Sequence, residues 1–274
     1  MEQRGAHIEF DHTGLVFEDG SERLRALRDL SISVLPGQSV ALIGPSGCGK
    51  STTLRLAAGL LTPTEGNVLV NGLAVGKPRK ETALIPQDLG LLPWKTVLQN
   101  AALGLVIRKV GKNRSHELAA EALTQVGLVG FEHSYPKELS GGMRQRLALA
   151  RALAMDADLL LMDEPLSAVD ALLRESLQDL LLDLWHERGH TQMLVTHSIE
   201  EAVYLGERIL VFSARPATLI ADIANQRVGD VGWRDSAEFA AKCNEVRDAL
   251  ALSRVPDDSS SGVPAAYSGE AGVR

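Results

Sequence analysis

The sequence has 274 residues, a net charge of −7 and 45% hydrophobic residues, values that are ordinary for a soluble globular protein with a buried core. The acidic balance argues against nucleic-acid phosphate as the main partner. The two cysteines, Cys48 and Cys243, form neither a disulfide framework nor a C-x-x-C metal pair. The chain shows no signal peptide and no apolar run near the roughly 20 residues that cross a bilayer. We therefore expect a soluble, cytoplasmic protein that can still work at a membrane through a partner.

Short apolar runs alternate with helical patterns over most of the chain. The expected strands are residues 8–10, 30–35, 39–43, 67–71, 158–162, 193–196, 209–213 and 217–220, and the expected helices are 51–58, 115–126, 147–154, 172–187 and 199–204. Buried strands that alternate with helices predict a mostly parallel α/β core, with an antiparallel flank from the first strands. The helical stretch at about 90–155 is predicted to be a subdomain inserted into that core.

The character of the sequence changes beyond residue 225, so the main domain is expected to cover 7–225 and a separate C-terminal part to cover 226–274. A helix is predicted at 236–250, with an apolar face of Phe239, Cys243, Val246 and Leu250. The last twenty or so residues are rich in Ser, Gly and Pro, a composition that predicts disorder. The sequence does not indicate what this C-terminal part does.

A glycine-rich segment follows the strand at 39–43 and fits the pattern G-x-x-x-x-G-K-[ST]. Its residues are Gly44, Pro45, Ser46, Gly47, Cys48, Gly49, Lys50, Ser51 and Thr52. Glycines let consecutive backbone N–H groups turn toward phosphate oxygens, and the helix that follows adds its positive end. Lys50 is expected to reach the β- and γ-phosphates, and the Ser51 hydroxyl to ligate Mg²⁺. The alternative, an ordinary turn, fits poorly because the segment lies between a strand and a helix.

The apolar strand at 158–162 leads into Asp163 and Glu164. Asp163 is placed to hold Mg²⁺ through water, and Glu164 to act as the general base that polarises the attacking water. An acid pair of this kind can also cap a helix. Because it follows a phosphate-binding loop in an α/β chain, the catalytic interpretation is favoured.

Ser140, Gly141 and Gly142 precede a second helix with a hydroxyl and bare N–H groups, which together form an anion site. One chain already has one phosphate-binding loop, so this second site is predicted to close on the nucleotide that a second subunit holds. Taken alone, the three residues are more often a plain helix cap.

These motifs resemble an ATP-binding-cassette (ABC) ATPase in their order and spacing. The resemblance covers about residues 7–220 and includes the phosphate-binding loop, Gln87, LSGGM at 139–143, LLLMDE at 159–164, the segment from Ser167 to Asp170, and His197. It implies a phosphate-loop NTPase fold with a RecA-like core, an antiparallel β flank and an inserted helical subdomain. It also implies ATP and Mg²⁺ as the bound groups.

The resemblance assigns further roles by position. Gln87 resembles the residue that contacts Mg²⁺ and senses the γ-phosphate, Asp170 the aspartate at the subunit interface, and His197 the histidine that donates a hydrogen bond to the γ-phosphate. Phe17 stands where the family places an aromatic ring that stacks on adenine, although a single Phe is as often a core residue. A histidine after a buried strand is otherwise usually structural.

The segment from Gln87 to Trp94 and the following T-V-x-x-N are similar to importer ATPases for nitrate, sulfonates, taurine and thiamine precursors. In that group this segment receives a helix of the transmembrane permease, and Trp94 is suited to anchor such a partner. A Trp packed in the protein's own core is the competing interpretation. Ser167 and Val169 replace the usual Gly and Leu before Asp170, and Ser198 replaces the usual Asp after His197, departures that bear on the subgroup rather than on phosphate chemistry.

The sequence therefore predicts the ATPase subunit of an importer at the cytoplasmic face of the membrane. Its expected partners are a permease, a second copy of the chain in the ATP-bound state and, indirectly, an extracellular or periplasmic solute-binding protein. The rivals are an ABC ATPase of DNA repair or translation, a module that only binds ATP, and an exporter. The transported solute cannot be read from this chain, because the ATPase does not touch the solute.

Overall fold

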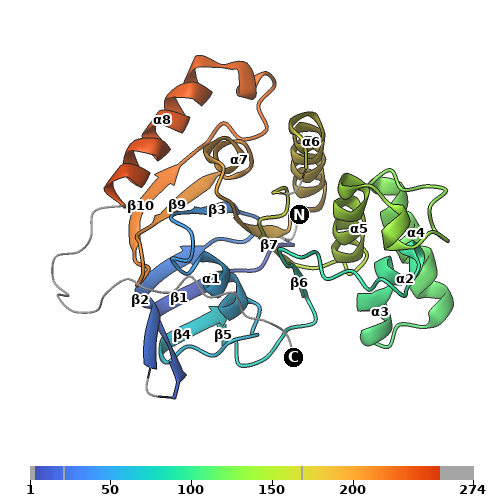
Figure 1. The fold of residues 1–274 in the computed structure, drawn as a ribbon, viewed down its shortest axis with the longest axis horizontal. Coiled ribbons are helices and arrows are strands. Elements are labelled where there is room, and N and C mark those ends of the chain that lie inside the picture. Colours follow the sequence, from blue (N-terminus) through green and yellow to red (C-terminus); the bar gives the residue numbers. More distant parts are fainter. Residues whose placement is uncertain (1–3, 21, 168, 254–274) are drawn as a thin grey trace.

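A six-stranded sheet forms the centre of the computed structural model, which describes residues 4–20, 22–167 and 169–253 (Figure 1). Its strand order is β10-β9-β3-β8-β7-β6, and every neighbouring pair is parallel except β10 with β9. The strands are β3 (Ser39–Ile43), β6 (Thr82–Ile85), β7 (Leu159–Asp163), β8 (Thr191–Val195), β9 (Arg208–Phe212) and β10 (Leu219–Ala224). Because four strands lie between others, β3, β7 and β8 are buried along their whole length and are mainly apolar.

A second, antiparallel sheet flanks the first, in the order β2-β1-β4-β5. It consists of β1 (Ile8–Asp19), β2 (Glu22–Val34), β4 (Glu65–Val70) and β5 (Leu73–Ala74). A turn at Pro36 and Gly37 connects β2 to β3, and Gly37 adopts a φ of 77°, a conformation that favours glycine. This sheet places the end of β1 and the start of β2, where the two strands connect, beside the carboxyl ends of the parallel strands.

Eight α-helices complete the described part of the chain. Four pack against the parallel sheet, namely α1 (Lys50–Ala57), α6 (Ala171–Arg188), α7 (Ile199–Leu205) and α8 (Ala237–Leu252). The others form a helical layer beyond β6 and β7, namely α2 (Val97–Ala101), α3 (Leu103–Ile107), α4 (Lys112–Gln125) and α5 (Gly141–Leu153) (Figure 1). This layer is the inserted helical segment that the sequence predicts.

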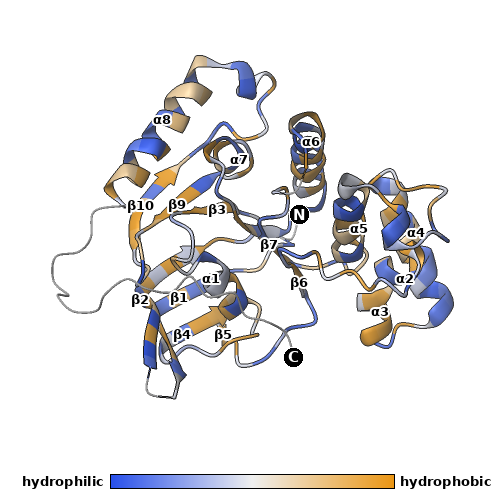
Figure 2. Cartoon of the chain, viewed as in Figure 1, coloured by the Kyte–Doolittle hydropathy of each residue, from blue (hydrophilic) through white to orange (hydrophobic). Residues whose placement is uncertain are grey.

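Alternation of side chains along the parallel strands produces two cores. On β3, Val40 and Leu42 pack with α1 and the antiparallel sheet, whereas Ala41 and Ile43 pack with α5 to α8. The C-terminal helix α8 covers β9 and β10 with Phe239, Cys243 and Val246, and the strands below it are hydrophobic (Figure 2). Leu250 is half-buried, so the predicted apolar face is confirmed.

Most predicted elements are confirmed within a few residues, but the predicted strands 8–10 and 30–35 are too short, since β1 extends to Asp19 and β2 begins at Glu22. The strands β5 and β6 were not predicted, and β10 begins at Leu219 rather than at residue 217. The tail predicted to be disordered, residues 254–274, lies outside the described residues. The domain boundaries at 225 and 226 stay a prediction. Within the part of the chain that the structure describes, no helix is both long enough and apolar enough to span a bilayer.

Candidate functional site

The loop between β3 and α1 has the conformation of a phosphate cradle. Gly47 and Gly49 have φ values of 70° and 129°, and a Cβ on Gly49 would lie 2.8 Å from the Leu27 side chain and 3.0 Å from a backbone oxygen. Helix α1 starts at Lys50 without a side-chain cap, so its first N–H groups are available to an anion. The Lys50 ammonium donates to the carbonyl oxygens of Gly44 and Pro45, both at 2.8 Å. A positive charge thus lies inside the loop.

Cys48 in this loop is buried, and burial raises the pKa of its thiol, with the nearby Lys50 ammonium opposing that shift. Because the thiolate is the reactive form, this environment disfavours redox chemistry at Cys48.

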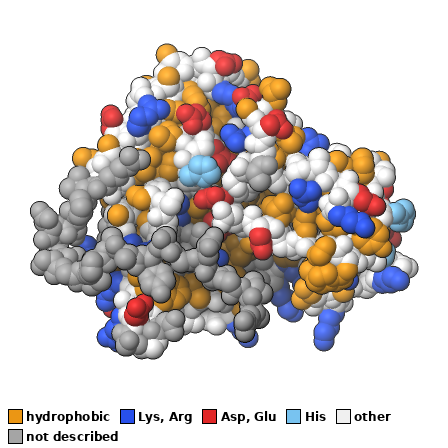
Figure 3. Space-filling model, viewed as in Figure 1, with side chains coloured by type: hydrophobic (Ala, Val, Ile, Leu, Met, Phe, Trp, Pro, Cys, Tyr) orange, Lys and Arg blue, Asp and Glu red, His pale blue; other side chains and the backbone are white. Residues whose placement is uncertain are grey.

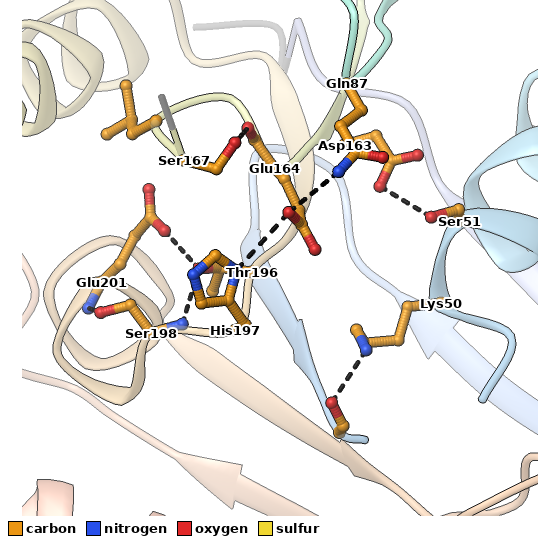
Figure 4. A network of polar contacts seen from close by, with 12 residues as sticks. Lys50, Ser51, Gln87, Asp163, Glu164, Ser167, Thr196, His197, Ser198 and Glu201 are labelled. Carbon is orange, nitrogen blue, oxygen red and sulfur yellow. Dashed lines mark hydrogen bonds and ion pairs between the residues drawn. The ribbon is translucent and has the colours of Figure 1, made fainter. Parts of the chain in front are cut away.

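A hydroxyl and a carboxylate meet beside the loop. Ser51 Oγ donates to Asp163 Oδ1 at 2.8 Å, which joins α1 to the end of β7 (Figure 4). Asp163 is only 6% exposed, and burial is the main cause that raises its pKa, while the Ser51 hydrogen bond opposes the shift. Both groups supply the hard oxygen donors that Mg²⁺ prefers. No group of three or more His, Cys, Asp or Glu within the described ranges is arranged to hold a metal ion by itself, so an ion here would take its remaining ligands from substrate and water. The pair therefore fits Mg²⁺.

Three side chains converge next to this pair (Figure 4). Gln87 Nε2 donates to Glu164 Oε2 at 3.2 Å, and His197 Nδ1 lies 3.5 Å from the same oxygen. Glu164 has a φ of 50°, an uncommon conformation for a residue with a side chain and one that clusters at functional sites. Gln87 follows β6, Glu164 follows β7 and His197 follows β8, so the carboxyl ends of three parallel strands place them together.

Lys50, Ser51, Gln87, Glu164 and His197 open on one cleft of about 690 Å³, which is the size of a small-molecule site. The phosphate loop, Gln87, Glu164 and His197 belong to its polar lining, and Phe17, Leu24 and Ala26 belong to its apolar lining. The Phe17 ring is 40% exposed, which excludes the interpretation as a core residue. The cleft therefore combines a polar part that suits phosphates with an apolar part that suits a planar base.

Sequence reasoning missed one charged residue of the cleft. Arg215, between β9 and β10, donates from Nε and Nη2 to the Gly47 carbonyl at 3.0 and 2.7 Å. Because a peptide unit is planar, these two hydrogen bonds to the Gly47 carbonyl also orient the N–H group of the next residue in the phosphate loop. No ion pair holds Arg215 among the described residues. Its sequence neighbourhood, Ser-Ala-Arg-Pro, has the composition of an ordinary turn and carries no signal of this contact.

The other predicted half-site does not line this cleft. Ser140 Oγ caps α5 by accepting from the Met143 N–H at 3.3 Å, with Gly141 and Gly142 in the first turn. A Cβ on Gly142 would lie 2.1 Å from the Leu173 side chain. Asp170 caps α6 in the same way, by accepting from the Leu173 N–H at 3.0 Å. Within one chain, these residues are helix caps.

The phosphate loop, the Asp-Glu pair and the histidine at the ends of parallel strands define a phosphate-loop nucleoside triphosphatase. A family model described as ABC transporter matches residues 27–167. The chain belongs to the ABC transporter family, and its fold is that of the family's ATPase cassettes.

Relatives and solved structures agree with this assignment. An uncharacterized ABC transporter ATP-binding protein of Methanocaldococcus jannaschii is 44% identical over 226 residues, which cover 82% of this chain and 84% of the relative. The taurine import ATP-binding protein TauB of Burkholderia pseudomallei is 47% identical over 207 residues, with coverages of 76% and 80%. A solved ATP-binding cassette in a dimeric post-hydrolysis state, bound to ADP and Pi, matches with a TM-score of 0.72 and 30% identity over 79% of this chain and 98% of that one. The predicted family, fold and ATPase class are confirmed.

Proposed function

We propose that this chain hydrolyses ATP to drive uptake of a small solute through a separate membrane permease. The observation that carries the proposal is the convergence of Lys50, Glu164 and His197 on one cleft at the ends of parallel strands. Import, rather than export, is supported by relatives named for taurine import at 45–47% identity over about three quarters of this chain. A taurine-like or sulfonate-like anion is the first candidate solute, with nitrate and thiamine precursors as further candidates.

The polar part of the cleft would bind the triphosphate. Lys50 would exchange its bonds to two loop carbonyls for bonds to phosphate oxygens, and the uncapped N–H groups of α1 would complete the cradle. Ser51, Asp163 and Gln87 would hold Mg²⁺, which when bound neutralises charge on the phosphates. Phe17 would stack on adenine in the apolar part.

Glu164 would act as the general base for the attacking water. Its carboxylate lies between the Gln87 amide and the His197 ring, which hold it in place at 3.2 and 3.5 Å. His197, with a side chain 63% exposed toward the cleft, would donate to the γ-phosphate as negative charge develops. The strained backbone of Glu164 supports a functional role for this residue.

The working form would be a homodimer with two ATP molecules, each between the phosphate loop of one chain and Ser140 to Gly142 of the other. This proposal is supported by the position of those residues outside their own cleft and by matched cassette structures that are described as dimeric. Asp170 would lie at the same interface. ATP binding would close the dimer, and hydrolysis would release it.

The permease would dock on the segment from Gln87 to Trp94. Asn100 is fully buried and bonds to Leu92, Lys95 and Thr96, which fixes this loop while the Trp94 side chain stays 71% exposed. The interpretation of Trp94 as a core residue is therefore wrong.

Val106 and Ile107 of α3 are also exposed, and hydrophobic side chains gather over this part of the helical layer (Figure 3). Ordered, exposed aromatic and aliphatic groups of this kind are typical of partner surfaces. The chain itself would remain peripheral at the cytoplasmic face of the membrane, with the solute-binding protein engaged only through the permease.

The test of the hydrolytic function is Glu164→Gln, measured by phosphate release and by size exclusion with ATP and Mg²⁺. We expect turnover to fall by about 100- to 10,000-fold because the base is lost, while ATP binding and ATP-dependent dimerisation persist. Glu200→Gln, an exposed carboxylate at the start of α7, is the matched control and should hydrolyse ATP at the wild-type rate. Normal turnover in Glu164→Gln would disprove the assignment of the base. Co-purification with a membrane permease, lost on Trp94→Ala, would test the transport role.

A further inference from the structure

The turn that carries His197 is closed by a ring of three hydrogen bonds that do not involve the His197 side chain. The Ser198 N–H donates to Thr196 Oγ1 at 3.0 Å, and the Glu201 N–H donates to Ser198 Oγ at 3.2 Å. The Thr196 hydroxyl in turn donates to Glu201 Oε2 (Figure 4). The imidazole itself is exposed and has one polar contact within the described residues, the one with Glu164. Its direction therefore depends on how its neighbours hold the turn.

Glu201 is an unusual residue to find at the base of this turn. Its side chain is on the first turn of α7 but only 4% exposed, and Oε1 has no hydrogen-bond partner among the described residues. Burial is the largest cause that raises its pKa. A buried carboxyl group with an unsatisfied oxygen costs stability, so the fold alone would favour an apolar side chain here. Such a group calls for an explanation other than packing.

The charges around Glu201 come from two residues of the hydrolytic site, His197 and Glu164, and from Arg174. Arg174 and His197 favour its carboxylate, and Glu164 disfavours it. Arg174 lies on α6 and holds the segment after Glu164, donating from Nη2 to the Val169 carbonyl at 2.9 Å and from Nε to the Leu166 carbonyl at 3.4 Å. Glu201 thus lies behind the Glu164–His197 pair and interacts with both segments that carry it.

We propose that Glu201 is a positioning residue for ATP hydrolysis, whose buried carboxyl group anchors Thr196 and thereby aims His197 into the nucleotide cleft. This inference rests on the proposed function, because it requires His197 and Glu164 to act in hydrolysis. A free Thr196 hydroxyl would let the turn at 196–198 rotate, and a shift of about 1 Å in a reacting group can cost a hundredfold in rate.

The test measures ATP hydrolysis in purified full-length variants. Glu201→Ala and Thr196→Val should each lower kcat by about 10- to 100-fold, with KM for ATP changed less than about threefold, because the phosphate cradle is untouched. Thr196→Ser keeps the hydroxyl, and Glu201→Gln keeps an oxygen that accepts from Thr196, so both should recover most of the rate. Glu121→Ala, which removes an exposed carboxylate on α4, is the control.

A double-mutant cycle separates positioning from general destabilisation. If Glu201 acts through His197, single-turnover rates of His197→Ala and of His197→Ala with Glu201→Ala should agree within about twofold. A double variant slower by the product of the two single effects would overturn the proposal, as would equal rates for Thr196→Val and Thr196→Ser. The Thr196 pair serves the same purpose if Glu201→Ala fails to fold. Failure of the proposed function would look different, since the wild type would then hydrolyse no ATP and His197→Ala would change nothing.

Discussion

The start of α1 and the start of α5 present similar backbone groups but differ in how those groups are used. At α1 no side chain caps the helix, and the first N–H groups face a cleft that Lys50, Asp163 and Glu164 also line or border. At α5 the Ser140 hydroxyl already accepts from the Met143 N–H, and the helix start lies outside the cleft. One half-site is assembled within the chain, and the other is not.

This difference shows what a single chain reveals about a site that two chains are proposed to share. A helix start without a cap requires an anion from outside, so the role of α1 is visible in its unsatisfied groups. A capped helix start is complete by itself, and the hydroxyl hydrogen and remaining N–H groups of α5 would act on a nucleotide only when a partner approaches. The geometry of α5 therefore agrees with both the plain cap and the shared site, and experiments must decide.

The largest expected effect tests directly whether the two half-sites meet. The experiment mixes two inactive variants. Lys50→Ala damages the cleft and Ser140→Arg damages the other half-site, and each should lower ATP turnover by about 100-fold or more. In a mixed dimer, one composite site contains the wild-type residue at both positions. Random mixing should then restore up to about a quarter of the wild-type rate in a phosphate-release assay, because half of the dimers are mixed and each has one intact site.

The control for this mixture is Lys50→Ala with Glu164→Gln. Both changes fall in the same half-site, so no composite site is intact and no recovery is expected. A Lys50→Ala and Ser140→Arg mixture that stays as inactive as its components would show that the two half-sites do not meet.

A smaller change separates the cap at Ser140 from its proposed contact with a partner's nucleotide. Ser236 caps α8 in the same way, by accepting from the Phe239 N–H at 3.0 Å, and does not line the cleft. Ser140→Ala and Ser236→Ala should each cost about 1 kcal/mol in the free energy of unfolding, because each loses a cap. Only Ser140→Ala should lower kcat, by about 100-fold, since one donor to the nucleotide is lost. Equal kcat values would leave Ser140 as a cap alone.

The assembled half-site could be predicted from the sequence because each part has a local signal. The strands β3, β7 and β8 are buried on both faces, so they appear as continuous apolar runs, and their ends locate the phosphate loop, the Asp-Glu pair and His197. The glycines of the loop are required by backbone conformation, which is also a local constraint.

The features that were missed depend on contacts between distant segments. The short edge strand β6 has an unremarkable sequence and becomes a strand by pairing with β7. Arg215 reaches Gly47 across 168 positions of sequence, and Glu201 becomes buried only because α7 packs on the sheet. No periodicity or motif encodes such contacts, so they appear only in the fold.

A third prediction concerns the stability of the fold and involves neither half-site. His190 precedes β8, at the opposite end of the strands from the cleft, and burial lowers its pKa from 6.5 to about 4. The folded state therefore disfavours the protonated ring. The contribution of neutral His190 to stability is complete above about pH 6.5 and is lost as the pH falls toward 4. Linkage gives a loss of about 2 kcal/mol between pH 7.5 and pH 5.

The measurement compares denaturant unfolding of the wild type and of His190→Gln at both pH values, so that the titration of other groups cancels. The difference in the free energy of unfolding between the two proteins should change by about 2 kcal/mol, and kcat at pH 7.5 should be the same in both. A pH-independent difference would mean that His190 is protonated equally in the folded and unfolded states.

The smallest expected effect concerns the apolar part of the cleft, where the ring of Phe17 is proposed to stack on adenine. If Phe17 stacks on adenine, Phe17→Ala should raise KM for ATP by about fivefold, which corresponds to about 1 kcal/mol of lost stacking, and leave kcat unchanged. Stacking does not depend on the identity of the base, so KM for GTP should rise by a similar factor, and Phe17→Trp should preserve binding. Phe131→Ala is the matched control, because its ring is equally exposed, at 40%, but lies in the helical layer. If both alanine variants bind ATP as tightly as the wild type, the nucleotide is held at its phosphate end alone, and the apolar part of the cleft takes no part in binding.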